Sequence, residues 1–101
     1  MSQYSDVVER FLRYVRIDSQ GDPGNRAEVP STACQHDMAR LLAAELVGLG
    51  AVDVTRTDHA YVTAHVPASA GCEDLPALAL NAHIDTESSV PGTGVSPQVV
   101  A

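Results

Sequence analysis

The feature that most constrains this chain is the segment Leu78–Thr86, which reads LALNAHIDT. The run from Ala77 to Ala82 is apolar on both faces, as in a central strand that helices cover on each side. It ends in a histidine, one spacer residue and an aspartate. Open α/β sheets place their ligand sites at the carboxyl ends of such strands. The segment therefore predicts a buried strand that carries His83 and Asp85 to the edge of a sheet.

The residues before this segment predict two helices followed by two strands. Apolar side chains recur at three- and four-residue spacing from Ser5 to Arg16, which predicts an amphipathic helix. A second helix is expected after Pro30 and up to Leu49, with Thr32 and Gln35 as a capping box at its start. Two alternating stretches between residues 52 and 66 predict a β-hairpin.

Two further features concern the surface. Arg10, Arg13 and Arg16 gather at the carboxyl end of the first helix, where they suit the helix dipole, and we expect them to form a solvated face.

Residues 18–29 are rich in turn formers and predict a long loop. We interpret this loop as a surface excursion, with a functional role as the alternative.

Composition excludes several classes of function. The net charge is −7, with six arginines and no lysine scattered along the chain, which argues against nucleic acid as a partner. No stretch is apolar over the ~18 residues that span a bilayer, and the first residues do not resemble a secretory signal. We therefore expect a cytoplasmic protein without membrane partners, in which Cys34 and Cys72 are free thiols.

The chemistry of the chain is concentrated in His83 and Asp85. In an extended strand, residues two apart lie on the same face, so Asp85 can accept the second ring N–H of His83 and leave the other nitrogen for a divalent cation. The alternative is a strand-end histidine that hydrogen-bonds to a nearby aspartate without any metal. A zinc site needs at least three protein ligands, and no other residue has the spacing to complete one. We therefore expect the 101-residue chain alone to be inactive.

Several segments together resemble one family. Nearly the whole chain is similar to the N-terminal part of peptidase T, the tripeptide aminopeptidase of the co-catalytic zinc exopeptidase and deacylase superfamily. The His83–Asp85 triplet is shared across that superfamily, whereas Ile17–Gln20 and Val29–Thr32 point to peptidase T in particular. The family usually has glycine where this chain has Ala60. Other matching segments are 11–15, 41–50, 53–55, 61–64, 82–86 and 97–100.

The resemblance implies a fold, a reaction and two residue roles. It implies that residues 1–101 are the N-terminal part of a three-layer α/β/α catalytic domain, here two helices and then three strands, with unpaired strand edges and an uncovered apolar face. The activity implied is the release of the N-terminal residue from small peptides, catalysed by two zinc ions. The resemblance further implies that His83 binds one of the zinc ions and that Asp85 is a catalytic residue that orients His83. A homodimer is implied for the complete enzyme. A related deacylase or dipeptidase, or a non-catalytic remnant, stays the alternative.

Overall fold

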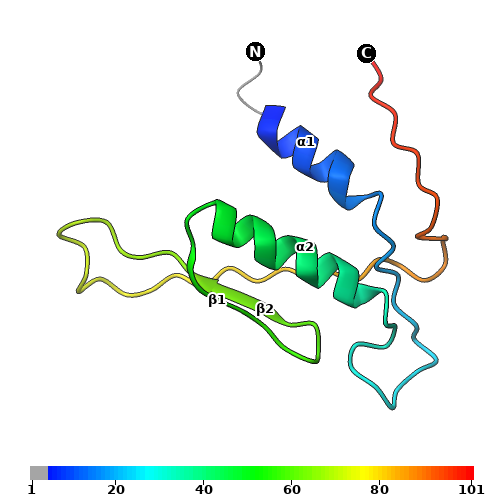
Figure 1. Ribbon diagram of the computed structural model, residues 1–101, viewed down its shortest axis with the longest axis horizontal. Helices are drawn as coiled ribbons and strands as arrows, with labels where there is room; N and C mark the ends of the chain where they lie inside the picture. Colours follow the sequence, from blue (N-terminus) through cyan, green and yellow to red (C-terminus); the bar gives the residue numbers. More distant parts are fainter. Residues whose placement is uncertain (1–4) are drawn as a thin grey trace.

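The computed structural model describes residues 5–101, which contain two helices and one two-stranded antiparallel sheet (Figure 1). Helix α1 spans Ser5–Tyr14 and helix α2 spans Gln35–Gly48. Strands β1 and β2 span Val52–Arg56 and Val62–His65. The two predicted helices and the predicted hairpin are confirmed, and the described part of the chain is a small α/β arrangement. No helix within it is both long and apolar enough to cross a membrane.

The small core lies between α2 and the hairpin. Helix α2 contacts both strands, which run along one side of it in Figure 1. The buried apolar residues are Met38 and Ala39 on α2 and Ala60 just before β2. The apolar stripe of α2 is therefore buried only in part, because Leu42 and Leu46 line a groove and Leu49 is 62% exposed.

Two residues in the hairpin have a left-handed backbone conformation. Val52 pairs with His65 and Thr55 with Thr63, so β1 carries one extra residue, a β-bulge at which Asp53 has φ of 52°. Ala60 has φ of 61°, a conformation that favours glycine because Cβ approaches the carbonyl oxygen. The structure thus explains why a glycine suits position 60.

The predicted central strand at residues 77–82 is wrong for this chain. The segment is not assigned to any strand, and Leu78 and Leu80 are 85% and 89% exposed. A strand buried on both faces needs a paired neighbour and a covering helix on each side. Residues 5–101 supply neither, and the nearest pairing is one isolated parallel bridge between Gln20 and Thr86. Two strands form instead of three.

Helix α1 is attached to α2 through the carboxylate of Glu45. Arg10 and Arg13 place guanidinium nitrogens 2.8 and 2.6 Å from its two oxygens, and the Tyr14 hydroxyl donates to it as well. The expectation of a purely solvated arginine face is therefore wrong for two of the three arginines. Hydrogen bonds from Tyr14 and then from the arginines hold the pKa of Glu45 below its ordinary value. Burial and the neighbouring carboxylate raise the pKa of Tyr14.

Helix α2 begins at Gln35, without the predicted capping box. The residue before it, Cys34, makes no side-chain cap hydrogen bond. The Thr32 hydroxyl instead donates to the carbonyl of Gln20 at 2.6 Å and accepts from the Gln35 side-chain amide at 3.0 Å. The capping prediction is wrong because this hydroxyl binds the long loop rather than the helix terminus.

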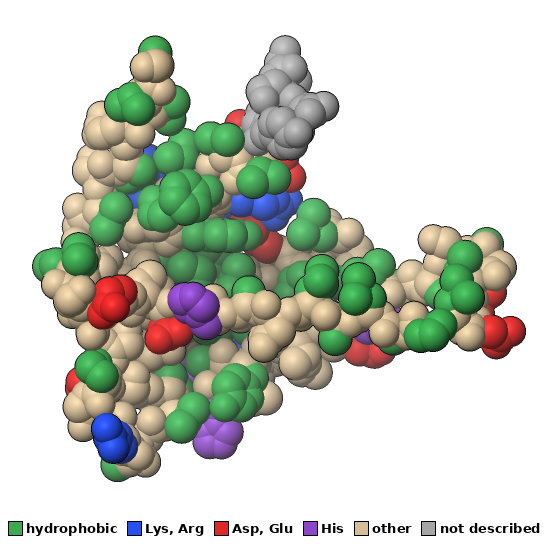
Figure 2. All heavy atoms as spheres, turned by 180° about the vertical axis from the view of Figure 1, so that it is seen from behind, with side chains coloured by type: hydrophobic (Ala, Val, Ile, Leu, Met, Phe, Trp, Pro, Cys, Tyr) green, Lys and Arg blue, Asp and Glu red, His purple; other side chains and the backbone are tan. Residues whose placement is uncertain are grey.

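The described chain is open and thin. Its extents are 47 × 43 × 19 Å, and its radius of gyration is 16.1 Å, against about 13 Å for a compact domain of this size. Large apolar side chains are exposed along the extended segments, and many apolar side chains lie open on the face drawn in Figure 2. The expected uncovered apolar face is therefore present.

Candidate metal-ligand site

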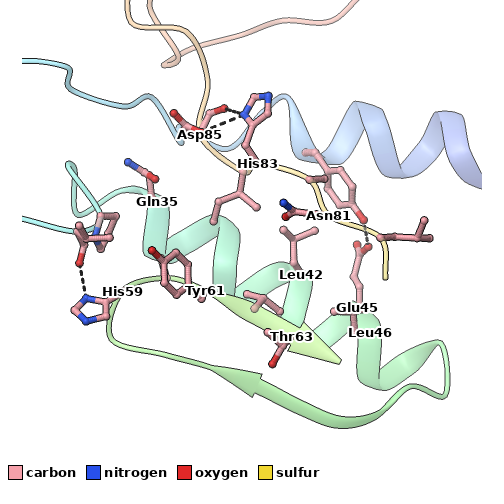
Figure 3. A pocket seen from close by; sticks show the side chains of 18 of the residues that line it. Gln35, Leu42, Glu45, Leu46, His59, Tyr61, Thr63, Asn81, His83 and Asp85 are labelled. Atoms are coloured by element: carbon pink, nitrogen blue, oxygen red, sulfur yellow. Dashed lines mark hydrogen bonds and ion pairs between the residues drawn. The ribbon is translucent and has the colours of Figure 1, made fainter. Parts of the chain in front are cut away.

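His83 and Asp85 contact each other directly (Figure 3). The Nδ1 atom of His83 lies 3.1 Å from Asp85 Oδ1 and 2.8 Å from the backbone carbonyl oxygen of the same residue. A carbonyl and a carboxylate only accept hydrogen bonds, so Nδ1 carries the proton and donates to both. The neutral ring then has its lone pair on Nε2. The predicted contact between the two side chains is confirmed.

This arrangement leaves one nitrogen free to bind a cation. The side chains of His83 and Asp85 are 84% and 52% exposed, so the ring is not packed among apolar groups. Neutral imidazole binds divalent metals through the unprotonated nitrogen, and a carboxylate on the other nitrogen fixes the orientation of the ring. The geometry of the pair is therefore that of an oriented ligand.

His83 lies beside a groove of about 760 Å³. In Figure 3, α2 contributes Leu42 and Leu46 to this groove and the hairpin contributes Tyr61 and Thr63. The extended residues 80–85 form the opposite wall. Polar and charged side chains also line the groove, Glu45, Asn81 and Asp85 among them. A cleft that combines apolar side chains with polar groups is typical of sites for small organic ligands.

A second, more polar hollow of about 380 Å³ meets the same two side chains. Asp22, Ser31 and Glu87 contribute polar atoms to it. The backbone N–H of Ser89 and then the Ser88 hydroxyl bind Glu87, and these hydrogen bonds lower its pKa. The hollow therefore presents negative charge next to the histidine at neutral pH.

The start of the long loop packs directly against the motif. Thr86 donates its backbone N–H to the Ser19 carbonyl at 3.0 Å, and Gly21 donates to the Thr86 carbonyl at 3.2 Å. The side-chain amide of Gln20 donates to the Ser88 carbonyl at 2.7 Å and accepts from the backbone N–H of Gly92 at 3.3 Å. The interpretation of residues 18–22 as part of a surface excursion is therefore wrong. The available signal was Ile17–Gln20, one of the two segments that point to peptidase T in particular.

The other histidines do not join His83. The Nδ1 atom of His59 lies 3.0 Å from the carbonyl oxygen of Val29, and no carboxylate accepts from this ring. Within residues 5–101, no three His, Cys, Asp or Glu side chains are grouped so as to hold a metal ion. The described residues thus offer one candidate ligand, His83, and no assembled metal site.

Comparison with known proteins identifies relatives with a consistent name. The chain is 40% identical over 95 residues to Peptidase T of Geobacillus thermodenitrificans and 38% identical over 96 residues to Peptidase T of Bacillus velezensis. It is 45% identical over 94 residues to Peptidase T of Shewanella pealeana. These alignments cover 93–95% of the chain. No protein-family profile matches it.

The similarity is high but covers only part of each relative. The chain spans 22–23% of the length of these curated proteins. The resemblance to peptidase T is confirmed over nearly the whole of the chain and supports a peptidase family. About three quarters of each relative has no counterpart in the 101 residues.

Proposed function

We propose that this chain is the N-terminal part of a metal-dependent aminopeptidase, which releases the N-terminal residue from tripeptides. The observation that carries the proposal is the pair of acceptors on His83 Nδ1, which leaves Nε2 as a lone-pair donor on an exposed ring. The names of the relatives support the reaction class. In the complete protein the fold is a three-layer α/β/α domain, in which residues 77–82 form a covered strand.

The residues present fit one ligand position of a zinc site. Asp85 keeps the proton on Nδ1 of His83, so the lone pair lies on Nε2, where a zinc ion would bind. Imidazole is a preferred zinc ligand. When bound, zinc supplies Lewis acidity toward a peptide carbonyl and a water molecule of lowered pKa. In this chain, His83 binds the metal and Asp85 holds the ring and stabilises positive charge on it.

The remaining ligands and the general base come from outside these residues. The chain spans 22–23% of the length of its relatives, and residues 5–101 supply one oriented ligand. The proposed enzyme is therefore built from this chain and a longer continuation, and it acts as a cytoplasmic homodimer. The first 101 residues alone are inactive.

The test uses the protein encoded by the full reading frame, assayed with tripeptides, dipeptides and N-acyl amino acids under limiting zinc. His83→Ala weakens zinc binding, and Asp85→Asn lowers turnover by about 10- to 100-fold, the usual cost of removing a partner of a metal-bound histidine. His59→Ala is the matched control, because this ring also lines the groove but its hydrogen bond in the described chain is to the Val29 backbone carbonyl and not to a carboxylate. Full activity in the first two variants would refute the assignment. If the protein prefers N-acyl amino acids or dipeptides, it is a related deacylase or dipeptidase. If the reading frame encodes no further metal ligands, the chain is a non-catalytic remnant.

A further inference from the structure

Gly21 lies behind the carboxylate that orients His83. A Cβ atom built on Gly21 would meet Asp85 Oδ2 at 3.2 Å and Asp85 Cβ at 3.7 Å. The other oxygen, Oδ1, accepts from the His83 ring. One oxygen of the Asp85 carboxylate therefore contacts the imidazole, and the other faces the space that a side chain at Gly21 would occupy.

The backbone at Gly21 is held in place on both sides. Its own N–H donates to the Thr86 carbonyl at 3.2 Å, and the N–H of Asp22 donates to the Ser31 hydroxyl at 2.9 Å. The Ser31 oxygen would also lie 3.6 Å from an added Cβ. Because the loop is fixed by these bonds, a side chain at Gly21 displaces Asp85 rather than the loop.

We propose that Gly21 is a positioning residue, whose missing side chain keeps the Asp85 carboxylate against His83 Nδ1 and so maintains the ring tautomer with a free Nε2. The inference rests on the proposed function in one respect, because it is there that the tautomer with a free Nε2 serves to bind a metal. The role does not come from backbone freedom, because the φ of Gly21 lies outside the left-handed region. It comes from the space that the glycine leaves for a carboxylate oxygen.

Gly24 offers a matched control in the same loop. A Cβ atom there would also lie 3.2 Å from a carboxylate oxygen, Asp22 Oδ1. That carboxylate accepts from the backbone N–H of Gly24 and is not hydrogen-bonded to His83. Gly21→Ala and Gly24→Ala therefore introduce the same steric contact, and only the first acts on the histidine.

The experiment measures the tautomer of His83 by long-range ¹H–¹⁵N correlation in the 101-residue chain, at a pH where the ring is neutral. Asp85→Ala sets the full effect of losing the carboxylate. Gly21→Ala lowers the fraction of the Nδ1–H tautomer by about twofold, since a hydrogen bond weakens steeply as its geometry departs from the optimum. The loss is partial because the backbone carbonyl of Asp85 still accepts from Nδ1. Gly24→Ala leaves the fraction unchanged.

A double variant, Gly21→Ala with Ser31→Ala, separates displacement from loss of local structure. Removing the Ser31 hydroxyl frees the loop to retreat from Asp85, so the wild-type tautomer returns. No change in Gly21→Ala, an equal change in Gly24→Ala, or no recovery in the double variant overturns the role of Gly21. If Asp85→Ala also leaves the tautomer unchanged, the backbone carbonyl alone fixes the ring, and the orienting role that the proposed function gives to the Asp85 carboxylate falls as well. If Asp85→Ala alone shifts the tautomer, the proposed function stands and only the Gly21 inference is lost.

Discussion

Replacing Glu45 with alanine should detach α1 from the rest of the chain. The apolar residues of α1 contribute little, because Val7 and Phe11 are 64% and 61% exposed. The Glu45 side chain is 13% exposed and accepts a part-buried hydrogen bond from Tyr14, a bond to a charged group that contributes about 1.5–3 kcal/mol. The ion pair with the half-exposed Arg13 adds about 0–1 kcal/mol. We expect Glu45→Ala to cost about 2 kcal/mol at this contact.

Hydrogen exchange of the α1 amides measures this cost directly, because exchange reports local opening without requiring two-state unfolding of the whole chain. A loss of 2 kcal/mol corresponds to about 30-fold faster exchange, at 1.4 kcal/mol for each factor of ten. Exchange in β1 and β2 should change much less, since the hairpin packs on α2.

Asp37→Ala is the control for Glu45→Ala. Asp37 pairs with Arg40 on the exposed face of the same helix, and neither residue contacts α1 through a hydrogen bond or ion pair in the described chain. This variant should leave α1 exchange within about threefold of wild type, as expected for an exposed pair. If the α1 amides of Glu45→Ala also exchange within about threefold of the wild-type rate, α1 is held by packing rather than by the Glu45 contacts. The predicted cost of about 2 kcal/mol would then be wrong.

Two further predictions follow from the same structure. Because the pKa of Glu45 is lowered on folding, its contribution is complete above the ordinary value of 4.5 and is lost as pH falls through the lowered value. The protection factors of the α1 amides, which compare exchange with the intrinsic rate at each pH, should therefore fall in acid, with a flatter profile in Glu45→Gln. Identical protection-factor profiles in the two proteins would contradict this. Because Leu78 and Leu80 are 85% and 89% exposed, the chain should self-associate at high concentration. Sedimentation velocity should show less association in the double serine variant, and equal association would place the contact elsewhere.

The parts of the fold that were predicted correctly depend on neighbouring residues. The apolar spacing on α2 and the alternation in β1 and β2 identify these elements, because each periodicity is a property of the segment itself. The contact between His83 and Asp85 is also local, since only Ile84 lies between them. The strand expected at residues 77–82 failed because pairing and burial depend on distant segments, which residues 5–101 do not provide.

The missed features are contacts between distant residues. Glu45 is 31–35 residues from the three groups that donate to it, and the Gln20 side chain reaches backbone atoms 68 and 72 residues away. Neither contact has a periodic signature. The sequence held one usable hint. Glu45 lies at the edge of the apolar stripe of α2, and the first helix carries arginines at three-residue spacing, so ion pairs come within reach once the two helices pack.

The candidate site likewise depends on two kinds of interaction: contacts within a short segment and contacts between distant segments. Orienting His83 requires only Asp85, two residues away, and the hydrogen bonds of the adjoining loop at Gly21 and Thr86. Holding a metal requires several donors to converge, and the entropy of bringing distant segments together is offset only by the burial of a complete core. Residues 5–101 have the first arrangement and not the second, because their buried apolar core is confined to Met38, Ala39 and Ala60. The tautomer of His83 is therefore set within these residues, and under the proposed function the remaining metal ligands would assemble around it.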